Sequence, residues 1–285
     1  MPDISAVIPT FNCKDFIKSC LDSVFVQGYQ NIEVIVVDNG SQDGTVNFIR
    51  ENYPEVILLQ NLQNLGACKA RNQGIERSSG CWILTLDCDI ILQKDFLSKI
   101  VKIIENLPSN IGMIQPKILY PDKKTIYSTG IYLSHLRRFY DIGKGKDDNG
   151  QFNTLRHIFG ACSAAALYRR DMLEELKEAT GYFDERFFFL VEDVDLSWRA
   201  QRRGWESLYY PKAICYHYGN SSRINKKLRQ YLCFRNRLYS IMKNEKLLHY
   251  FLKIYPMFLY DFPHLIYLAI TNKYIFNKNL PEIKN

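Results

Sequence analysis

The chain has 285 residues, of which 47% are hydrophobic and 24% are charged. These values exclude collagen-like, low-complexity and wholly disordered proteins, and the length predicts one large domain or one domain with an appendage. The formal net charge of +7 is unevenly distributed, because residues 1–201 carry a net −4 and residues 202–285 a net +11. Such a basic end is typical of a segment that meets an anionic surface.

The chain contains eight cysteines, and none of them forms a CxxC pair. No Cys/His cluster has the spacing of zinc ligands, so a zinc site is not expected. No N-terminal segment combines a charged start with the apolar core of a signal peptide. We therefore expect reduced thiols and a cytoplasmic location.

The first third of the chain alternates short apolar segments with segments of helical spacing. Strands are predicted at 4–8, 32–37, 56–60 and 82–86, and helices at 15–27, 44–51 and 66–77. This alternation predicts right-handed crossovers and a parallel sheet. Polar residues follow three of the strands, at 9–12, 38–41 and 87–89. Because ligands of open α/β sheets bind beyond the carboxyl ends of the strands, we expect these loops to line one crevice.

The remainder of the chain is less regular. Residues 120–156 are rich in basic and polar side chains and indicate a hairpin or loop insertion with little core. Further strands are expected at 158–168, 207–210 and 213–216, and helices at 171–179 and 192–203. From about residue 223 the composition shifts to Lys, Arg, Tyr, Phe and Leu. We therefore expect one domain at 1–222 and a separate region at 223–285.

Asp87 and Asp89 follow the strand at 82–86 and flank a single residue. Two carboxylates at this spacing can reach one divalent cation such as Mg²⁺, which takes carboxylate oxygens together with substrate phosphates. Such a pair also occurs by chance in solvated turns. Its position after a buried strand, close to two other polar strand ends, favours a metal site.

Glu192 and Asp193 follow the aromatic run at 187–189. Partial burial behind such a run raises the pKa of a carboxyl group towards that of a useful general base. A structural explanation stays open, because acidic residues at the start of a helix stabilise its dipole. Asp195 and Arg199 are four residues apart and are more typical of a structural pair than of a catalytic one.

Two further positions are candidates for binding. His217 ends a strand-like segment and precedes a polar Gly-Asn-Ser-Ser run, so it could bind a metal or a phosphate, although a single histidine is more often structural. Arg71 lies on the helix predicted at 66–77, whose N-terminus suits a diphosphate. A glycine N-cap explains Gly66 equally well.

Six segments, in order along the chain, carry a resemblance to a known family. They are SAVIPTFN at 5–12, IVVDNGSQDGT at 35–45, NLGACKARNQGI at 64–75, ILTLDCD at 83–89, FDERFFFLVEDVDLSWRAQRRG at 183–204 and HYGNSS at 217–222. Over about residues 3–223 the chain resembles the family 2 glycosyltransferases of the rhamnosyltransferase-like branch. The resemblance implies the α/β GT-A fold, a Rossmann-like, mostly parallel twisted sheet flanked by helices, here with a C-terminal helical appendage.

The resemblance also implies how a nucleotide-sugar donor is bound. Thr10 and Asp38 match positions that contact the nucleobase and the ribose, and Arg71 matches a residue near the nucleotide. Asp87 and Asp89 match the acidic motif that holds the ribose and the metal–diphosphate. Within that motif, Asp89 is the expected metal ligand.

For catalysis, the resemblance implies a Mg²⁺ or Mn²⁺ ion and a general base. His217 matches a position that reaches the metal or the diphosphate, Asp193 matches the base that deprotonates the acceptor hydroxyl, and Glu192 is the expected acceptor-side or supporting residue. The expected reaction is an inverting transfer of a hexose or deoxyhexose to a glycan or polyprenyl-linked acceptor in cell-surface polysaccharide synthesis. No QxxRW motif is present, which favours a non-processive enzyme.

Other functions fit parts of the sequence. A nucleotidyltransferase shares the sheet and a metal-binding acid, but needs an early Gly-rich basic phosphate loop, which residues 8–20 lack. A dehydrogenase needs GxGxxG after the first strand, where this chain has PTFNC. A membrane-associated scaffold protein with a degenerate enzyme domain is disfavoured, because the acidic residues and the histidine named above are all present.

The last part of the chain predicts membrane contact. Residues 223–246 interleave eight Lys and Arg with apolar residues, as in a basic amphipathic helix. Residues 247–270 are apolar and aromatic, but Lys253, Asp261 and two prolines favour broken interfacial helices over a transmembrane helix. We expect 223–270 to bind an anionic membrane at the inner face of the plasma membrane. Packing on the catalytic domain or a homodimer are alternatives, and without a recognition motif nucleic-acid binding is not expected.

Overall fold

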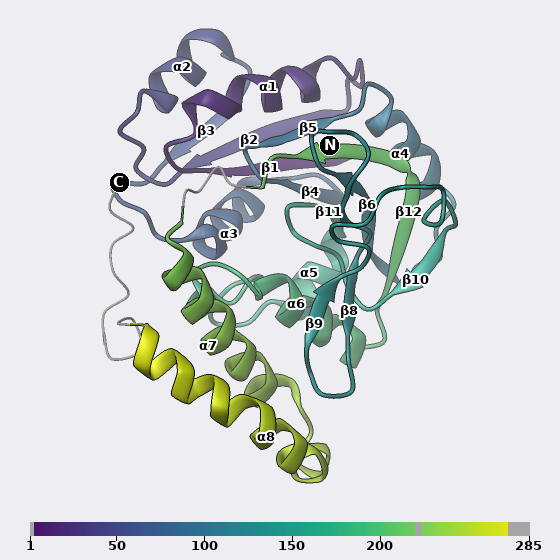
Figure 1. Cartoon of the computed structure of the whole chain (residues 1–285). Coiled ribbons are helices and arrows are strands. Elements are labelled where there is room, and N and C mark those ends of the chain that lie inside the picture. Colours follow the sequence, from purple (N-terminus) through teal and green to yellow (C-terminus); the bar gives the residue numbers. More distant parts are fainter. Residues whose placement is uncertain (1–2, 220–223, 273–285) are drawn as a thin grey trace.

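One sheet of ten strands organises the molecule (Figure 1). The computed structural model describes residues 3–219 and 224–272, with 247–257 described in their backbone only. The main path of the sheet runs β10 (Arg156–Ile158), β12 (Glu206–His217), β6 (Ile111–Leu119), β11 (Ala165–Arg169), β4 (Trp82–Leu86), β1 (Ile4–Thr10), β2 (Ile32–Asp38) and β3 (Ile57–Gln60). Two short strands extend it, β5 (Ile90–Leu92) beside β12 and β7 (Ile126–Ser128) beside β6.

The half of the sheet that the sequence predicted is parallel. β1 pairs in parallel with β2 and β4, and β2 pairs in parallel with β3. The antiparallel pairings come from β11, which lies between β4 and β6, and from short strands at the other end of the sheet. The α/β prediction with a central sheet flanked by helices is therefore confirmed.

Helices cover both faces of the sheet (Figure 1). One face packs against α1 (Lys14–Phe25), α2 (Thr45–Asn52) and α4 (Phe96–Ile104), and the other against α3 (Ala67–Arg77), α5 (Arg170–Leu176) and α6 (Glu192–Arg202). Strand β1 shows the cause, because side chains alternate along a strand. Ile4, Ala6 and Ile8 enter the first core, and Val7 enters the second.

Two parts of the middle of the chain differ from the sequence prediction. No element was predicted between residues 90 and 119, where the structure has β5, α4 and the fully buried β6. The two strands predicted at 207–210 and 213–216 are one strand, β12, whose register with β6 shifts between Tyr210 and Ile214. Pro211 lies in this shift, and a proline cannot donate to a ladder, which suits a bulge.

The insertion at 120–156 forms a hairpin, which is one of the two structures predicted for it. It contains β7 and a hairpin of β8 (Ile131–Leu133) and β9 (Phe139–Asp141), and β10 follows it. The expectation of little core is wrong, because apolar side chains of the insertion form a small cluster with its neighbours: Leu119, Ile126, Phe152, Ile158 and Tyr209. β11 begins later than predicted, at residue 165, and the residues before it reach the cleft described below.

The C-terminal region contains two helices, α7 (Lys226–Asn244) and α8 (Leu247–Thr271). The predicted helix at 223–246 is confirmed over 226–244, and residues 220–223 lie outside the described part. The prediction of broken helices at 247–270 is wrong, because α8 is continuous across both of its prolines, although each proline removes an N–H donor and crowds the carbonyl four residues before it. None of the described helices is long and apolar enough to span a membrane. The division at residue 222 stays a prediction.

A buried ionic cluster ties α7 to α6. Asp195 accepts hydrogen bonds from Arg199 at 2.9 Å, from Lys243 at 3.0 Å and from the Asn244 amide at 2.7 Å. Lys243 also lies 2.9 Å from Asp184, and both aspartates are fully buried. Asp195 and Arg199 are thus the structural pair that their spacing predicted, and the cluster joins residues about 50 positions apart.

We expect replacement of Asp195 by alanine to destabilise the protein by about 3–5 kcal/mol, because Arg199 and Lys243 would remain buried without this partner. Urea unfolding followed by circular dichroism measures the change. The matched control is Lys18→Ala, which breaks an exposed pair with Asp22 and should cost below about 1 kcal/mol. A similar small cost for both variants would contradict the structural role of the cluster.

Candidate functional site

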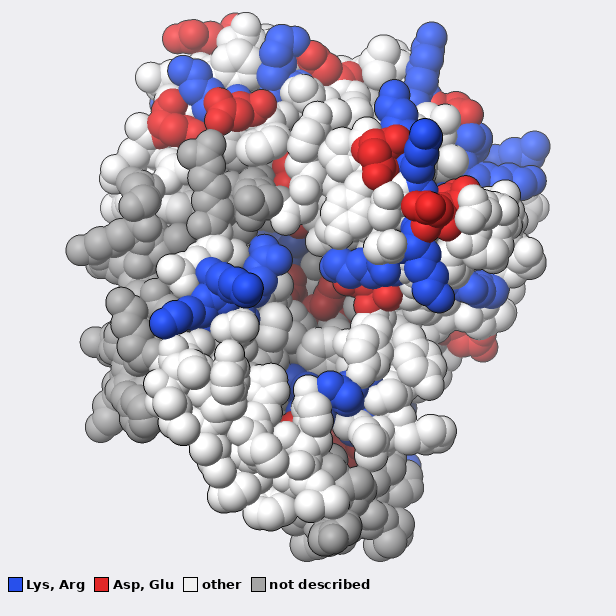
Figure 2. All heavy atoms as spheres, in the orientation of Figure 1, with Lys and Arg blue, Asp and Glu red and all other residues white. Residues whose placement is uncertain are grey.

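A cleft of about 630 Å³ lies at the carboxyl ends of β1 and β4. Loops after these two strands line it, together with the starts of α3 and α6, part of the insertion and the first half of α7. Figure 2 shows acidic side chains in the floor of this hollow and Lys and Arg side chains on both sides of it. The predicted crevice is confirmed, because all three polar loops contribute to it, through residues 9–11, 39 and 87–88.

At one end of the cleft, Thr10 and Asp38 are joined. The Thr10 hydroxyl donates to the Asp38 carboxylate at 3.1 Å. Asp38 also accepts the backbone N–H groups of Gly40 and Ser41, and it is fully buried. Thr10 and Asn39 line the cleft, and Asp38 does not. Asp38 therefore shapes the loop that presents Asn39, and its predicted contact with a nucleotide stays a prediction.

Asp87, Asp89 and His217 converge, as the sequence predicted. One ligand atom from each lies within 4.8 Å of the others. The His217 Nε2 is 3.1 Å from Asp89 and 3.8 Å from Asp87. The antiparallel pairing of β5 with β12 produces this meeting, because it places Ile90 opposite His217. The Tyr127 ring, 4.3 Å from the imidazole, packs against it from the insertion.

These three residues fit a divalent cation. Two carboxylates and one imidazole form an oxygen-rich donor set that suits Mg²⁺ or Mn²⁺. The other imidazole nitrogen, Nδ1 of His217, is buried and has no hydrogen-bond partner among the described residues. Burial raises the pKa of Asp87, against the opposing effect of Arg71. A cation here would favour the ionised carboxylates that this burial disfavours.

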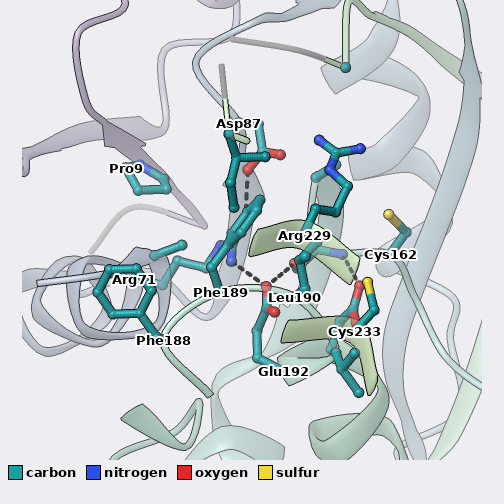
Figure 3. A pocket seen from close by; sticks show the side chains of 18 of the residues that line it. Pro9, Arg71, Asp87, Cys162, Phe188, Phe189, Leu190, Glu192, Arg229 and Cys233 are labelled. Atoms are coloured by element: carbon teal, nitrogen blue, oxygen red, sulfur yellow. Dashed lines mark hydrogen bonds and ion pairs between the residues drawn. The ribbon is translucent and has the colours of Figure 1, made fainter. Parts of the chain in front are cut away.

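Arg71 connects Asp87, which follows β4, to Glu192 at the start of α6 (Figure 3). Its guanidinium lies 2.8 Å from Asp87 and 2.6 Å from Glu192, and it is buried. Glu192 also accepts the Ser163 hydroxyl at 3.1 Å. Arg71 and Glu192 both line the cleft, but their charged groups are engaged with each other. Glu192 is thus paired with Arg71 in the structure, and its predicted acceptor-side or supporting role stays a prediction.

Asp193 faces the cleft without a cationic partner in direct contact among the described residues. Its carboxylate accepts the backbone N–H of Ser163 at 3.2 Å and that of Val194 at 2.8 Å. Burial and the neighbouring carboxylates of Glu192 and Asp141 raise the pKa of Asp193 to about 7. A carboxyl group with this pKa suits proton transfer near neutral pH.

Several residues of the cleft were not found from the sequence. The insertion contributes Asp141 and Lys144, whose side chains pair at 2.7 Å, and α7 contributes Arg229 and Cys233. Phe188, Phe189 and Leu190 form an apolar wall (Figure 3). Only the aromatic run carried a signal in the sequence. The others lie in segments that no motif marks, and packing alone brings them to the cleft.

Comparisons with known proteins show the family of the chain. The family model "Glycosyl transferase family 2" matches residues 5–177, and the chain belongs to this family. Glycosyltransferase GlyA of Streptococcus pneumoniae is 24% identical over 200 residues, which are 67% of this chain and 29% of the relative. The poly-beta-1,6-N-acetyl-D-glucosamine synthase of Staphylococcus aureus is 24% identical over 216 residues, 75% of this chain and 49% of the relative. The chain thus spans less than half the length of these relatives.

Solved structures share the fold. Residues 1–349 of Staphylococcus aureus TarS match with a TM-score of 0.57 at 17% identity, over 99% of this chain and 77% of that chain. The mannosyltransferase PcManGT from Pyrobaculum calidifontis, in complex with GDP-Man and Mn²⁺, matches with a TM-score of 0.62 at 16% identity, over the same shares. At these identities the likeness shows the fold alone, and the expected GT-A fold is confirmed.

The raised pKa of Asp193 predicts a pH-dependent cost to stability. A carboxyl group whose pKa is higher in the folded state than its ordinary value of 3.8 stabilises the fold when protonated, and this contribution is lost as the pH rises through about 7. We therefore expect Asp193→Asn to gain in melting temperature over the wild type as the pH rises from about 5 to about 8. The control, Asp171→Asn, changes an exposed residue and should show no such gain. If the melting temperatures of wild type and Asp193→Asn changed in parallel with pH, the raised pKa of Asp193 would be contradicted.

Proposed function

We propose that this chain is a metal-dependent, inverting and non-processive glycosyltransferase. It moves a hexose or deoxyhexose from a nucleoside-diphosphate sugar to a hydroxyl of a glycan or polyprenyl-linked acceptor in cell-surface polysaccharide synthesis. The observation that carries this proposal is a single cleft lined by Asp87 and His217 of the candidate cation site and by Asp193, a carboxyl group with a pKa of about 7. The family supports transfer from a nucleotide sugar, and one relative is named as a polysaccharide synthase.

The donor half of the proposed site lies around the cation cluster. Mg²⁺ or Mn²⁺ held by Asp87, Asp89 and His217 would neutralise charge on the leaving nucleoside diphosphate. Thr10 lies at the cleft, where it would contact the nucleobase or ribose, with Asp38 fixing its position through their hydrogen bond. The two polar loops that follow β1 and β2 therefore serve the nucleoside, and the loop after β4 serves the diphosphate.

The acceptor half of the proposed site lies around Asp193. As general base, Asp193 takes the proton of the acceptor hydroxyl while the oxygen attacks the anomeric carbon, and a single displacement inverts that centre. Arg71 is engaged by Asp87 and Glu192, so the base remains free of a direct cationic partner among the described residues. The apolar wall formed by Phe188, Phe189 and Leu190 suits the faces of sugar rings.

The C-terminal helices support a membrane location for this activity. Large apolar side chains of α8 are exposed: Phe258, Leu259, Tyr260, Phe262, Leu265, Ile266, Tyr267 and Ile270. The first turns of α7 expose Lys226, Lys227 and Arg229. Apolar area and basic residues together favour binding to the surface of an anionic membrane. We propose that the protein is peripheral at the inner face of the plasma membrane, where a polyprenyl-linked acceptor is found.

A panel of nucleotide sugars tests the donor reaction. We expect one donor to release its nucleoside diphosphate, with loss of activity on chelation and recovery with Mn²⁺ or Mg²⁺. Asp89→Asn and Asp193→Asn should each lower transfer by at least about 100-fold. Asp95→Asn is the matched control, because Asp95 is an exposed acid before α4 and should retain activity. Product stereochemistry measured by NMR tests inversion.

Two outcomes would contradict this proposal. A flat panel with every donor and metal would favour a membrane-associated scaffold with a non-catalytic GT-A domain. Consumption of a nucleoside triphosphate with a sugar phosphate would instead favour a nucleotidyltransferase. Near-normal transfer by Asp193→Asn would remove Asp193 as the base and leave the donor assignment intact.

Sedimentation with lipid vesicles tests the membrane proposal. We expect the full chain to bind vesicles that contain anionic lipid and to dissociate at high salt. A Phe258→Ser/Phe262→Ser variant removes two exposed rings that stack 4.8 Å apart and should weaken binding. The control is Leu62→Ser, since Leu62 is fully exposed after β3. No binding, together with a dimer in solution that the double variant dissociates, would show that α8 is a protein interface instead.

A further inference from the structure

The loop at 188–191, directly before α6, has an unusual backbone. Phe188, Leu190 and Val191 have φ values of 65°, 69° and 73°. Residues other than glycine rarely adopt this left-handed region, and for a β-branched residue such as valine it is a genuine outlier. Three such residues within four positions need their surroundings to hold them in place. The loop forms the apolar wall of the cleft and leads into the start of α6 (Figure 3).

On one side, the loop is fixed by α3. The backbone N–H of Cys68 donates to the Phe188 carbonyl at 3.2 Å. Gly66 makes room for the same residue, because a Cβ on Gly66 would lie 2.6 Å from the Phe188 ring. The Phe189 N–H bonds to the Phe187 carbonyl at 2.7 Å and closes a γ-turn with positive φ, which is a rare and strained turn. The apolar wall of the cleft therefore packs against the start of α3, which is expected to lie beside the donor.

On its other side, the loop contacts α7, whose Leu228 and Leu232 pack against Phe189 and Leu190 and whose Asn236 binds the loop backbone. Asn236 is fully buried, and its Nδ2 donates to the carbonyl oxygens of Phe187, Phe189 and Leu190 at 3.0, 2.9 and 2.8 Å. Because three acceptors surround one atom, only the NH₂ group of the amide can face them. Arg235 adds a further donor to the Phe187 carbonyl at 3.1 Å. Among the described residues, the carbonyls of Phe189 and Leu190 receive hydrogen bonds from Asn236 alone.

We propose that Asn236 is a positioning residue for the transfer reaction. It holds the loop at 188–191, and through the backbone it sets the start of α6, where the Asp193 carboxylate faces the cleft. It touches no reacting atom. The kinetic part of this inference rests on the proposed glycosyl transfer, whereas its structural part rests on the hydrogen bonds of α7. On this reading, α7 completes the catalytic site whether or not the protein meets a membrane.

Kinetics of the purified full chain test the proposal. In Asn236→Ala the loop loses its three hydrogen bonds, and we expect kcat to fall on the order of 100-fold, as for a misplaced catalytic group. Asn236→Asp should lose more, because a carboxylate cannot donate and repels the three carbonyls. The Kd for the nucleoside diphosphate should stay within about threefold, since the donor half is unchanged.

The matched control is Asn244→Ala. Asn244 is also a buried amide of α7, and its Nδ2 donates to Asp195 at 2.7 Å and to the Ser240 carbonyl at 3.0 Å, with no contact to the loop. We expect this variant to melt at a lower temperature and to retain kcat within about threefold, because it leaves the transition-state contacts in place. All variants are compared at a temperature at which circular dichroism shows each of them folded.

Hydrogen exchange followed by mass spectrometry gives a readout that does not require turnover. In the absence of substrate, peptides that cover 186–195 should exchange faster in both Asn236 variants than in the wild type, and should be unchanged in Asn244→Ala. This result would stand even if no donor were transferred, which separates the inference from the proposed function. Unchanged kcat in the Asn236 variants of an active enzyme, an equal loss of kcat in Asn244→Ala, unchanged exchange, or variants that cannot fold would each overturn the positioning role.

Discussion

The buried guanidinium of Arg71 is the interaction on which the site depends. It comes from α3 and binds Asp87 after β4 and Glu192 at the start of α6, so it links the cation cluster to the helix that carries Asp193. A buried charge is tolerated only when it is well paired, and loss of one partner is costly. The two adjacent carboxylates therefore differ. Glu192 pairs with Arg71, whereas Asp193 has no such partner in direct contact among the described residues, and burial raises its pKa to about 7.

The second constraint is that α7 is bonded to the elements that form the cleft. Lys243 and Asn244 complete the buried cluster around Asp195, and Asn236 supports the strained loop that precedes Asp193. The basic charge of the C-terminal part therefore has two uses. Some of it pairs with acidic groups inside the molecule, as Lys243 does, and Arg237 pairs with Asp261 of α8. Other basic residues of this part are exposed, among them Lys226, Lys227 and Arg229 in the first turns of α7, and Arg229 lines the cleft.

Much of the fold was predictable because it follows from patterns of neighbouring residues in the sequence. Alternating apolar runs and helical spacing located the elements from β1 to β4, and the rule that ligands bind beyond strand ends correctly predicted that Asp87 lines the cleft. The bulged strand β12 and the buried strand β6 were harder to predict, because a proline interrupts each of them and β6 also buries the polar residues Gln115 and Lys117. The two prolines of α8 led to a wrong prediction for a related reason. They are a local signal for a break in the helix, but α8 is continuous.

By itself, the amino-acid sequence determined the α/β class, the polar strand ends and the residue types of a cation site, since these follow from periodicity and from the chemistry of Asp and His. Only the tertiary structure decided which groups each of these side chains contacts. It pairs Glu192 with Arg71 and places Asp141 near Asp193. It also brings Asn236 into contact with the loop at 188–191, which is more than 40 residues away in the sequence. Burial and pairing across such distances arise from packing, and packing determines which of two neighbouring carboxylates remains available for a proton.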